Sequence, residues 1–233
     1  MNLLLLSNST QPGHGWLEHA KTAIAHFFGQ EDIHPWFIPY AGVSISWDEY
    51  YEKARVFFAR INQTLESLHR SPNPKQSITG AQGIIVGGGN SFYLLKTLQD
   101  LDLLDPIHSQ VASGKAKYLG WSAGANLVCP GIYTTNDMPI CEPKSLKALG
   151  LIDFQINPHY TNRTLEGHGG ESRDQRIHEF CQLHPNTKVL GLPEGSYLRV
   201  QGSDTILDGA HDGIWFLGSK SPKVCDVGQV VKN

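Results

Sequence analysis

Two kinds of hydrophobic pattern alternate along the first part of the chain. The continuous apolar run at 2–7 and the run at 83–86 are typical of strands that are buried on both faces of a parallel sheet, and 33–40, with Trp36, Phe37 and Ile38, predicts a further strand. Residues 15–29 and the segment that follows Ser46 instead repeat their apolar positions at the period of an amphipathic helix. This alternation of strand and helix predicts an α/β fold with a mostly parallel, doubly wound sheet.

Local signals indicate where several elements begin and end. Ser46, with Glu49 at the third helical position, forms a capping-box pattern, and Ser172 is placed to cap a later helix. Residues 106–113 suit a short helix. The polar, proline-rich stretch 69–80 predicts an exposed connection.

The last third of the chain changes in character. Residues 132–135 predict a short strand, and residues 188–195 predict a buried strand that ends near Glu194. Beyond it, short apolar runs separated by Gly, Ser, Asp and Pro predict a short antiparallel C-terminal extension; they lie at 197–200, 205–207, 213–217 and 224–231. No boundary divides the chain, so we expect a single α/β domain over residues 1–233.

Composition narrows the function classes. The 233 residues carry a formal charge of −3 without a cluster of Lys or Arg, so nothing indicates a nucleic-acid partner. The four cysteines contain no C-x-x-C pair, and no His-Glu-x-x-His motif occurs, so we expect neither a metal nor another cofactor. These cysteines are Cys129, Cys141, Cys181 and Cys225.

The sequence also gives no indication of a signal peptide or a membrane span. The apolar run Leu3–Leu6 has no basic segment before it, is too short for a signal peptide, and is followed at once by the polar residues 7–10. No stretch approaches the roughly 18 apolar residues of a membrane span. We therefore expect a cytoplasmic protein, a monomer or homodimer with no membrane partner.

The clearest candidate for chemistry is a serine between two glycines. An apolar strand at 117–121 leads into Ser122, which Gly120 and Gly124 flank in the Gly-x-Ser-x-Gly pattern of a nucleophile elbow. The backbone N–H of Ala123 would then point to where an oxyanion develops. A strand-to-helix turn that carries a serine by chance is the plain alternative.

A second glycine cluster follows the strand at 83–86. Gly87, Gly88 and Gly89 precede a helical pattern, and their backbone N–H groups can form an anion-binding nest for a reaction oxyanion or a substrate carboxylate. A nucleotide phosphate is disfavoured, because Gly-x-Gly-x-x-Gly would require glycine where Phe92 stands. A tight turn without a ligand is the remaining alternative.

A serine nucleophile needs a general base and an acid that orients it. His159 follows Pro158 after a strand-like segment, and Glu194 ends a later strand, so both can meet Ser122 at the carboxyl edge of one parallel sheet. Asp137 is an alternative acid. Other candidate histidines are His14, His34, His168 and His178.

The predicted order of nucleophile, histidine and acid differs from that of the α/β-hydrolases, which argues against an ordinary esterase or lipase. Arg173 and Arg176 lie in the first turn of the helix that follows Ser172. Because a helix N-terminus disfavours positive charge, this pair hints at an anionic partner, although solvated surface arginines are the commoner explanation.

The chain resembles the peptidase E family of α-aspartyl dipeptidases. The resemblance extends from the N-terminus to about residue 200 and is poor at 69–80. Its matching segments are Leu3–Thr10, Val86–Asn90, Gly120–Asn126, Thr134–Pro139, Gln155–His159 and Gly191–Gly195.

This resemblance implies a fold akin to the class I glutamine amidotransferases and a cytosolic serine peptidase that removes N-terminal aspartate from Asp-Xaa dipeptides. It makes Ser122 the nucleophile, His159 the base, and Glu194 or Asp137 the third member. An oxyanion hole would comprise Ala123 with Gly88 or Gly89. We assign the substrate's aspartate carboxylate to Arg173, with Arg176 behind it.

Two other functions use the same features. An esterase or acyltransferase of this fold would use the same elbow. A non-catalytic binding module of amidotransferase-like fold would keep the glycine nest without needing Ser122.

Overall fold

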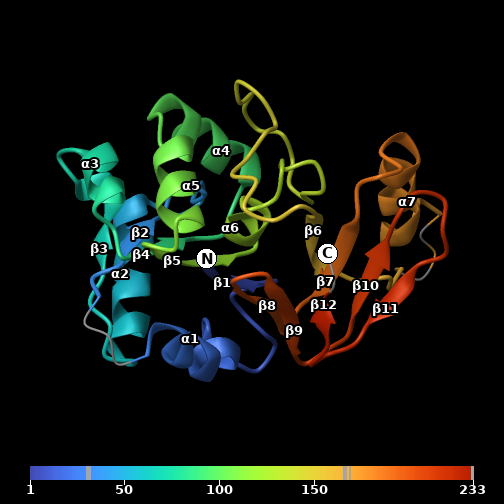
Figure 1. Ribbon diagram of the computed structural model, residues 1–233, viewed down its shortest axis with the longest axis horizontal. Coiled ribbons are helices and arrows are strands. Elements are labelled where there is room, and N and C mark those ends of the chain that lie inside the picture. Colours follow the sequence, from blue (N-terminus) through green and yellow to red (C-terminus); the bar gives the residue numbers. More distant parts are fainter. Residues whose placement is uncertain (30–32, 165–166, 168, 232–233) are drawn as a thin grey trace.

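An eight-stranded sheet forms the larger part of the molecule (Figure 1). The computed structural model describes residues 1–29, 33–164, 167 and 169–231. Five strands run parallel and the three on one side of β1 are antiparallel, which confirms the predicted α/β class with a mostly parallel sheet and an antiparallel C-terminal extension. In spatial order the strands are β12 (Val230–Val231), β9 (Asp204–Gly209), β8 (Ser196–Gln201), β1 (Asn2–Leu6), β5 (Lys117–Trp121), β4 (Gly83–Val86), β2 (Trp36–Ile38) and β3 (Glu66–Ser67).

The leucine run of β1 explains why this strand is central. Alternate side chains of a strand point to opposite faces, so Leu3 and Leu5 join one core cluster while Leu4 and Leu6 join the other. Helices α1 (Lys21–Phe28) and α2 (Trp47–Ala59) pack on the second cluster, whereas α3 (Pro74–Thr79), α4 (Ser91–Asp100) and α5 (Leu104–Ala112) pack on the first. Figure 1 shows these two layers below and above the sheet. The arrangement is doubly wound, as predicted.

A second, four-stranded sheet stands beside the first (Figure 1). Its order is β11 (Lys223–Cys225), β10 (Gly213–Phe216), β7 (Val189–Pro193) and β6 (Gln155–Tyr160), with β6 and β7 parallel. Helix α7 (Arg173–Leu183) packs on it through Ile177 and Cys181, against Phe216. The expectation that Ser122, His159 and Glu194 share one sheet is therefore wrong: β8 pairs antiparallel with the free edge of β1, so β6 and β7 form a sheet of their own.

Several local predictions also need correction. The stretch 69–80 is not merely a connection, because Asn73 caps α3 and Pro74 occupies its first turn. Residues 132–135 form a turn, in which Thr135 N donates to Ile132 O, rather than a strand. Helix α1 begins only at Lys21, after Leu17 with a φ of +58° and the short 3₁₀ turn Glu18–Ala20. Another 3₁₀ turn spans Leu68–Arg70.

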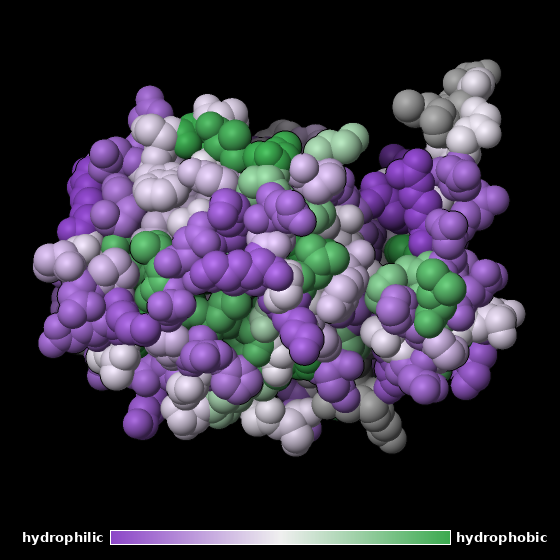
Figure 2. All heavy atoms as spheres, turned by 90° about the horizontal axis from the view of Figure 1, so that it is seen from above, coloured by the Kyte–Doolittle hydropathy of each residue, from purple (hydrophilic) through white to green (hydrophobic). Residues whose placement is uncertain are grey.

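The helix starts at Ser46 and Ser172 are as predicted. Each serine hydroxyl accepts from the backbone of the third helical residue, whose own side chain bonds back to the serine N–H. Figure 2 shows the face seen from above, where the second sheet and α7 form a smaller lobe and apolar patches are interrupted by hydrophilic side chains. Of the helices that the structure describes, none has the length and apolar character needed to cross a membrane.

Candidate active site

Ser122 lies at a strained turn between β5 and the short helix α6 (Ala123–Asn126). Its φ of +53° and ψ of −113° are backbone angles that L-residues rarely adopt. The flanking glycines make the turn feasible, because a Cβ on Gly120 would stand 2.4 Å from the carbonyl oxygen of Gly124, and one on Gly124 would stand 2.2 Å from that of Val86. Strand and helix thus approach too closely for any side chain, as an exposed nucleophile on an elbow requires.

This crowding has a measurable consequence. We expect Gly120→Ala to lower the free energy of unfolding by about 3 kcal/mol, because backbone must move to admit the methyl group, and to lower Tm by roughly 6–12 °C. Gly80→Ala is a matched control, since its Cβ would meet only the oxygen of Gln76 at 3.8 Å. Thermal unfolding of both variants measures the difference; equal Tm values for the two would contradict the close approach.

The glycine nest stands next to the serine. A Cβ on Gly88 would lie 3.0 Å from the Cβ of Ser122, and Gly89 has a φ of +138°. Within the described ranges, no acceptor is found for the backbone N–H of Gly88 or Gly89, and the N–H of Ala123 belongs to a first helical turn without an intrahelical acceptor. Two backbone segments next to Ser122 thus carry unpaired N–H donors, an arrangement that suits an oxyanion hole.

Two buried aromatic side chains hold the nest in place. The Tyr50 hydroxyl donates to the carbonyl oxygen of Gly88 at 3.0 Å and accepts from Nε1 of Trp121 at 2.9 Å. Burial raises the pKa of Tyr50 and keeps this phenol neutral, so it remains a donor. Nothing in the hydrophobic pattern distinguishes Tyr50 from the other core aromatics of α2, so the sequence alone does not predict its role.

The three polar side chains predicted to meet are brought together across the two sheets. His159 Nε2 lies 2.9 Å from Ser122 Oγ, and His159 Nδ1 lies 2.6 Å from Glu194 Oε1. A carboxylate at Nδ1 favours a proton there, which leaves Nε2 to accept the serine hydroxyl proton. The imidazole and carboxylate are 39 % and 47 % exposed, so the site is open to substrate and water.

The sequence pattern placed His159 after a strand-like segment, whereas in the structure His159 lies within β6. Its φ is +54°, at an irregularity where the pairing with β7 shifts between Asn157 and Tyr160. Because of this bulge, the imidazole points toward Ser122 rather than to the face that the regular alternation of side chains would give it. Bulges of this kind carry no periodicity signal in the sequence.

Asp137 lies elsewhere, at the start of α4. Its Oδ2 accepts from the backbone N–H and the hydroxyl of Ser91, at 2.7 Å each, and from the hydroxyl of Thr135 at 3.1 Å. A carboxylate is favoured at a helix N-terminus. The geometry therefore pairs His159 with Glu194 and gives Asp137 a structural position beside the nest that precedes α4.

Two polar residues after β1 connect the two sheets, a role that was not predicted from the sequence. Buried Ser7 donates to the carbonyl oxygen of Leu192 and accepts from the backbone N–H of His159, at 2.8 Å in each case. Asn8 accepts from the N–H of Gly195 at 2.9 Å. They fix the backbones of His159 and the Glu194 turn relative to β1. Polar residues directly after a wholly buried strand were the available signal.

The predicted arginines differ in their surroundings. Exposed Arg176 has a carboxylate oxygen of Glu171 at 4.0 Å. Half-buried Arg173 has no ion-pair partner among the residues that the structure describes, and burial, with Arg176 nearby, lowers its pKa. Helix α7 is attached beside the histidine, since the Tyr160 hydroxyl donates to Asp174 Oδ1 at 2.6 Å.

Ser122 and Glu194 contact His159, and none of the alternative histidines in the described part of the chain takes its place. His34 precedes β2 and so lies toward the amino edge of the parallel strands. His178 lies on α7 and packs against Phe216 of β10. His14 is exposed on the loop after β1. His168 lies outside the described residues.

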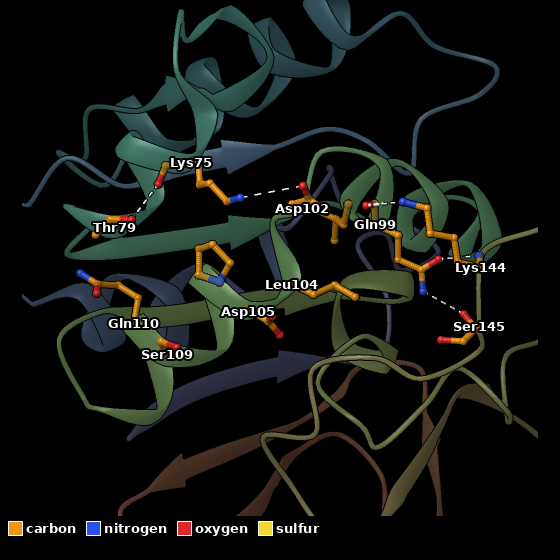
Figure 3. A pocket seen from close by; sticks show the side chains of 12 residues that line it. Lys75, Thr79, Gln99, Asp102, Leu104, Asp105, Ser109, Gln110, Lys144 and Ser145 are labelled. Atoms are coloured by element: carbon orange, nitrogen blue, oxygen red, sulfur yellow. Dashed lines mark hydrogen bonds and ion pairs between the residues drawn. The ribbon is translucent and has the colours of Figure 1, made fainter.

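A cleft of about 570 Å³ opens at Ser122. Its walls include His159, the nest, the loop 41–45 and α2, while Arg173 and Arg176 are not among the described residues that line it. A larger groove of about 780 Å³ lies between α3, α4 and α5 (Figure 3), and several of its polar groups pair with one another: Lys75 with Asp102, and Gln99 with the Lys144 and Ser145 backbone. The reactive groups therefore lie in the smaller cleft.

Metal ligands do not cluster in the part of the chain described: no three His, Cys, Asp or Glu side chains there are grouped to hold an ion. All four cysteines are free thiols. The hydroxyl of Ser122, the imidazole of His159 and the carboxylate of Glu194 are groups of the kind that serve acyl transfer by a serine.

Known proteins share both the sequence and the fold. The profile of peptidase family S51 matches residues 3–207. The chain is 49 % identical over 209 residues to peptidase E of Salmonella typhimurium and 48 % identical to that of Salmonella arizonae, each match covering 90 % of both chains.

Two crystal structures are similar in fold. A peptidase E protein of Listeria monocytogenes, assigned that name provisionally, superposes with a TM-score of 0.67 at 21 % identity, covering 90 % of this chain and 98 % of that one. A peptidase from an acI-B1 actinobacterium superposes with a TM-score of 0.69 at 18 % identity, covering 100 % and 96 %.

Proposed function

Because this chain belongs to peptidase family S51 and is a serine dipeptidase, we propose that it hydrolyses dipeptides with an N-terminal aspartate through a triad of Ser122, His159 and Glu194. The observation that carries the proposal is the continuous hydrogen-bonded line from the Ser122 hydroxyl through His159 to Glu194. The free thiols of all four cysteines suit the reducing cytoplasm in which we propose that it acts.

The first chemical step follows from this line. His159 Nε2 takes the proton of Ser122 as the serine oxygen attacks the scissile carbonyl, and Glu194 stabilises the imidazolium that forms. His159 then gives the proton to the leaving amine, and an acyl-enzyme remains. Water, deprotonated by the same imidazole, releases the aspartate.

The developing oxyanion would be bound by the N–H of Ala123 and by that of Gly88 or Gly89. The unpartnered donors of the nest support this assignment. Such preorganised donors act where charge develops, and losing one typically lowers kcat by about 10²- to 10³-fold. Tyr50 contributes indirectly by holding the Gly88 carbonyl.

The preference for aspartate requires a cation for its side-chain carboxylate. Arg173 is our candidate, because its guanidinium is half-buried without a carboxylate partner in the described residues and α7 is attached beside His159. Arg176 is the weaker candidate, since it already lies near Glu171.

The deciding experiment compares hydrolysis of Asp-Leu, Leu-Leu and isoAsp-Leu, with EDTA present. We expect cleavage of Asp-Leu alone. Cleavage of Leu-Leu at a similar rate would leave a serine dipeptidase without the aspartate preference. Faster turnover of simple acyl esters would instead favour an esterase, and failure of a fluorophosphonate to label Ser122 would favour a binding module.

The arginine assignment predicts a specific loss of selectivity. In Arg173→Gln we expect the ratio of kcat/KM for Asp-Leu over Asn-Leu to fall by about 10- to 100-fold, as a charge-assisted hydrogen bond is removed. Arg176→Gln is the matched control and should change the ratio less than threefold, the range of a surface charge. An Arg173 variant that kept the full preference for aspartate would rule out this assignment.

A further inference from the structure

One lysine lines the same cleft as the serine. Lys53, on α2, is the only lysine or arginine among the described residues that line this cleft. The same cleft is lined by Ser122, His159 and the nest glycines Gly88 and Gly89. No role in the proposed triad or in aspartate recognition uses this residue. A lysine in a substrate cleft is a natural partner for an anionic group.

The charge of Lys53 is not neutralised by its neighbours on α2. Glu49, one turn before it, is held in the capping box by Ser46, whose N–H and hydroxyl donate to Glu49 Oε2 at 3.0 and 2.7 Å. Glu52 instead accepts from Arg55 at 2.9 Å. Within the described part of the chain, no carboxylate forms an ion pair with Lys53.

An aromatic cluster positions the ammonium group. Lys53 Nζ lies 4.9 Å from the centroid of the Trp16 ring, a cation–π distance. Trp16 in turn packs edge-on against Trp121 at 5.5 Å and Tyr50 at 6.3 Å, both of which support the nest. The cation therefore has a defined place relative to the oxyanion donors.

The position of Lys53 on α2 determines on which side of the cleft its ammonium group lies. Lys53 is three residues after Tyr50, so the two side chains share one face of α2. Figure 1 shows α2 and α7, the helices that carry Lys53 and Arg173, on opposite sides of β5, the strand that leads into Ser122.

An Asp-Xaa dipeptide carries two carboxylates, one on each side of the scissile bond. We propose that Lys53 binds the free C-terminal carboxylate of the leaving residue, and so favours dipeptides over longer or C-terminally blocked substrates. This inference rests on the proposed function, with the aspartyl side chain directed to Arg173. The carboxylate of a dipeptide follows directly after the leaving residue's Cα, whereas a longer peptide has an uncharged amide there.

The test removes one charge from the substrate, its C-terminal carboxylate, and one from the enzyme, the ammonium group of Lys53. Kinetics are measured for Asp-Leu and Asp-Leu amide with wild type, Lys53→Met and Lys53→Arg. Methionine keeps much of the aliphatic stem over Trp16 but not the charge. Lys115→Met is the matched control, because Lys115 is exposed on the loop before β5.

For wild type we expect KM to be about fivefold lower for Asp-Leu than for its amide, the size of an exposed ion pair. Lys53→Met should raise KM for Asp-Leu to that of the amide, with a much smaller change in KM for the amide itself. Lys53→Arg should restore most of the difference, and Lys115→Met should resemble wild type. A Tm equal to that of wild type shows that each variant is folded.

Failure has three distinguishable forms. Equal losses on Asp-Leu and its amide would show that Lys53 does not bind the C-terminal carboxylate. A fall in the ratio of Asp-Leu over Asn-Leu in Lys53→Met would assign the lysine to the aspartate side chain and overturn the proposal. If wild type cleaves neither aspartyl substrate, the proposed function itself fails, and this inference with it.

Discussion

Replacing Ser122 with alanine is expected to lower kcat for Asp-Leu by about 10⁶-fold, the loss typical of removing the nucleophile of a serine triad. Without the hydroxyl, His159 Nε2 loses its 2.9 Å partner and no acyl-enzyme can form. Only the donors of Ala123, Gly88 and Gly89 would still act on a bound substrate. Single-turnover assays at high enzyme concentration measure the residual rate.

A loss of folding must be separated from a loss of chemistry. Ser122→Ala should unfold at a Tm equal to or above that of wild type, since alanine keeps the Cβ at this strained position and adds no atoms. Ser113→Ala, on the exposed end of α5, is the matched control and should keep full activity. A Ser122→Ala enzyme within tenfold of wild type would mean that another group is the nucleophile.

The second prediction with a large effect distinguishes Glu194 from Asp137 as the acid that orients His159. Glu194→Gln should lower kcat by about 10³- to 10⁴-fold, because an amide of the same shape cannot stabilise the imidazolium and favours the wrong tautomer of His159. We expect the smaller loss, about 10³-fold, because the carboxylate is half-exposed and water already screens its interaction with the imidazolium. Steady-state kinetics on Asp-Leu give the comparison.

Asp137→Asn is the informative partner of that variant. Its carboxylate accepts from Ser91 in the first turn of α4 rather than touching His159, so we expect activity within about tenfold of wild type and a loss of about 1 kcal/mol in unfolding free energy, the size of a lost hydrogen bond at a helix N-terminus. If Asp137→Asn lost more activity than Glu194→Gln, Asp137 and not Glu194 would be the third member of the triad.

Local patterns predicted much of this molecule, for reasons visible in single segments. The buried run of β1, the capping box at Ser46 and the elbow at Ser122 each depend on residues close together in the chain. The errors also have local causes. Polar, proline-rich composition suggested a plain connection where Asn73 and Pro74 in fact start α3. Residues 132–135 have strand-like composition, but the chain turns there and finds no neighbouring strand.

The candidate site depended more on tertiary structure. The sequence left Glu194 and Asp137 as alternatives because both lie near predicted turns, and no spacing relates either one to His159. Only folding shows that Glu194 contacts the imidazole while Asp137 lies at the start of α4. Lys53 and Tyr50 likewise look like ordinary members of an amphipathic helix until α2 is packed against the nest.

By itself, then, the sequence determined the α/β class, the tight turn at Ser122 with its glycines, the nest and the residue types of the proposed triad, because these follow from hydrophobic period and from backbone angles that neighbouring residues impose. Only the tertiary structure decided that β6 and β7 form a second sheet, that a bulge turns His159 toward Ser122, and that Ser7 joins the two sheets. Strand pairing and contacts between residues distant in the chain are set by which edges and faces remain available after packing, and no local pattern records them.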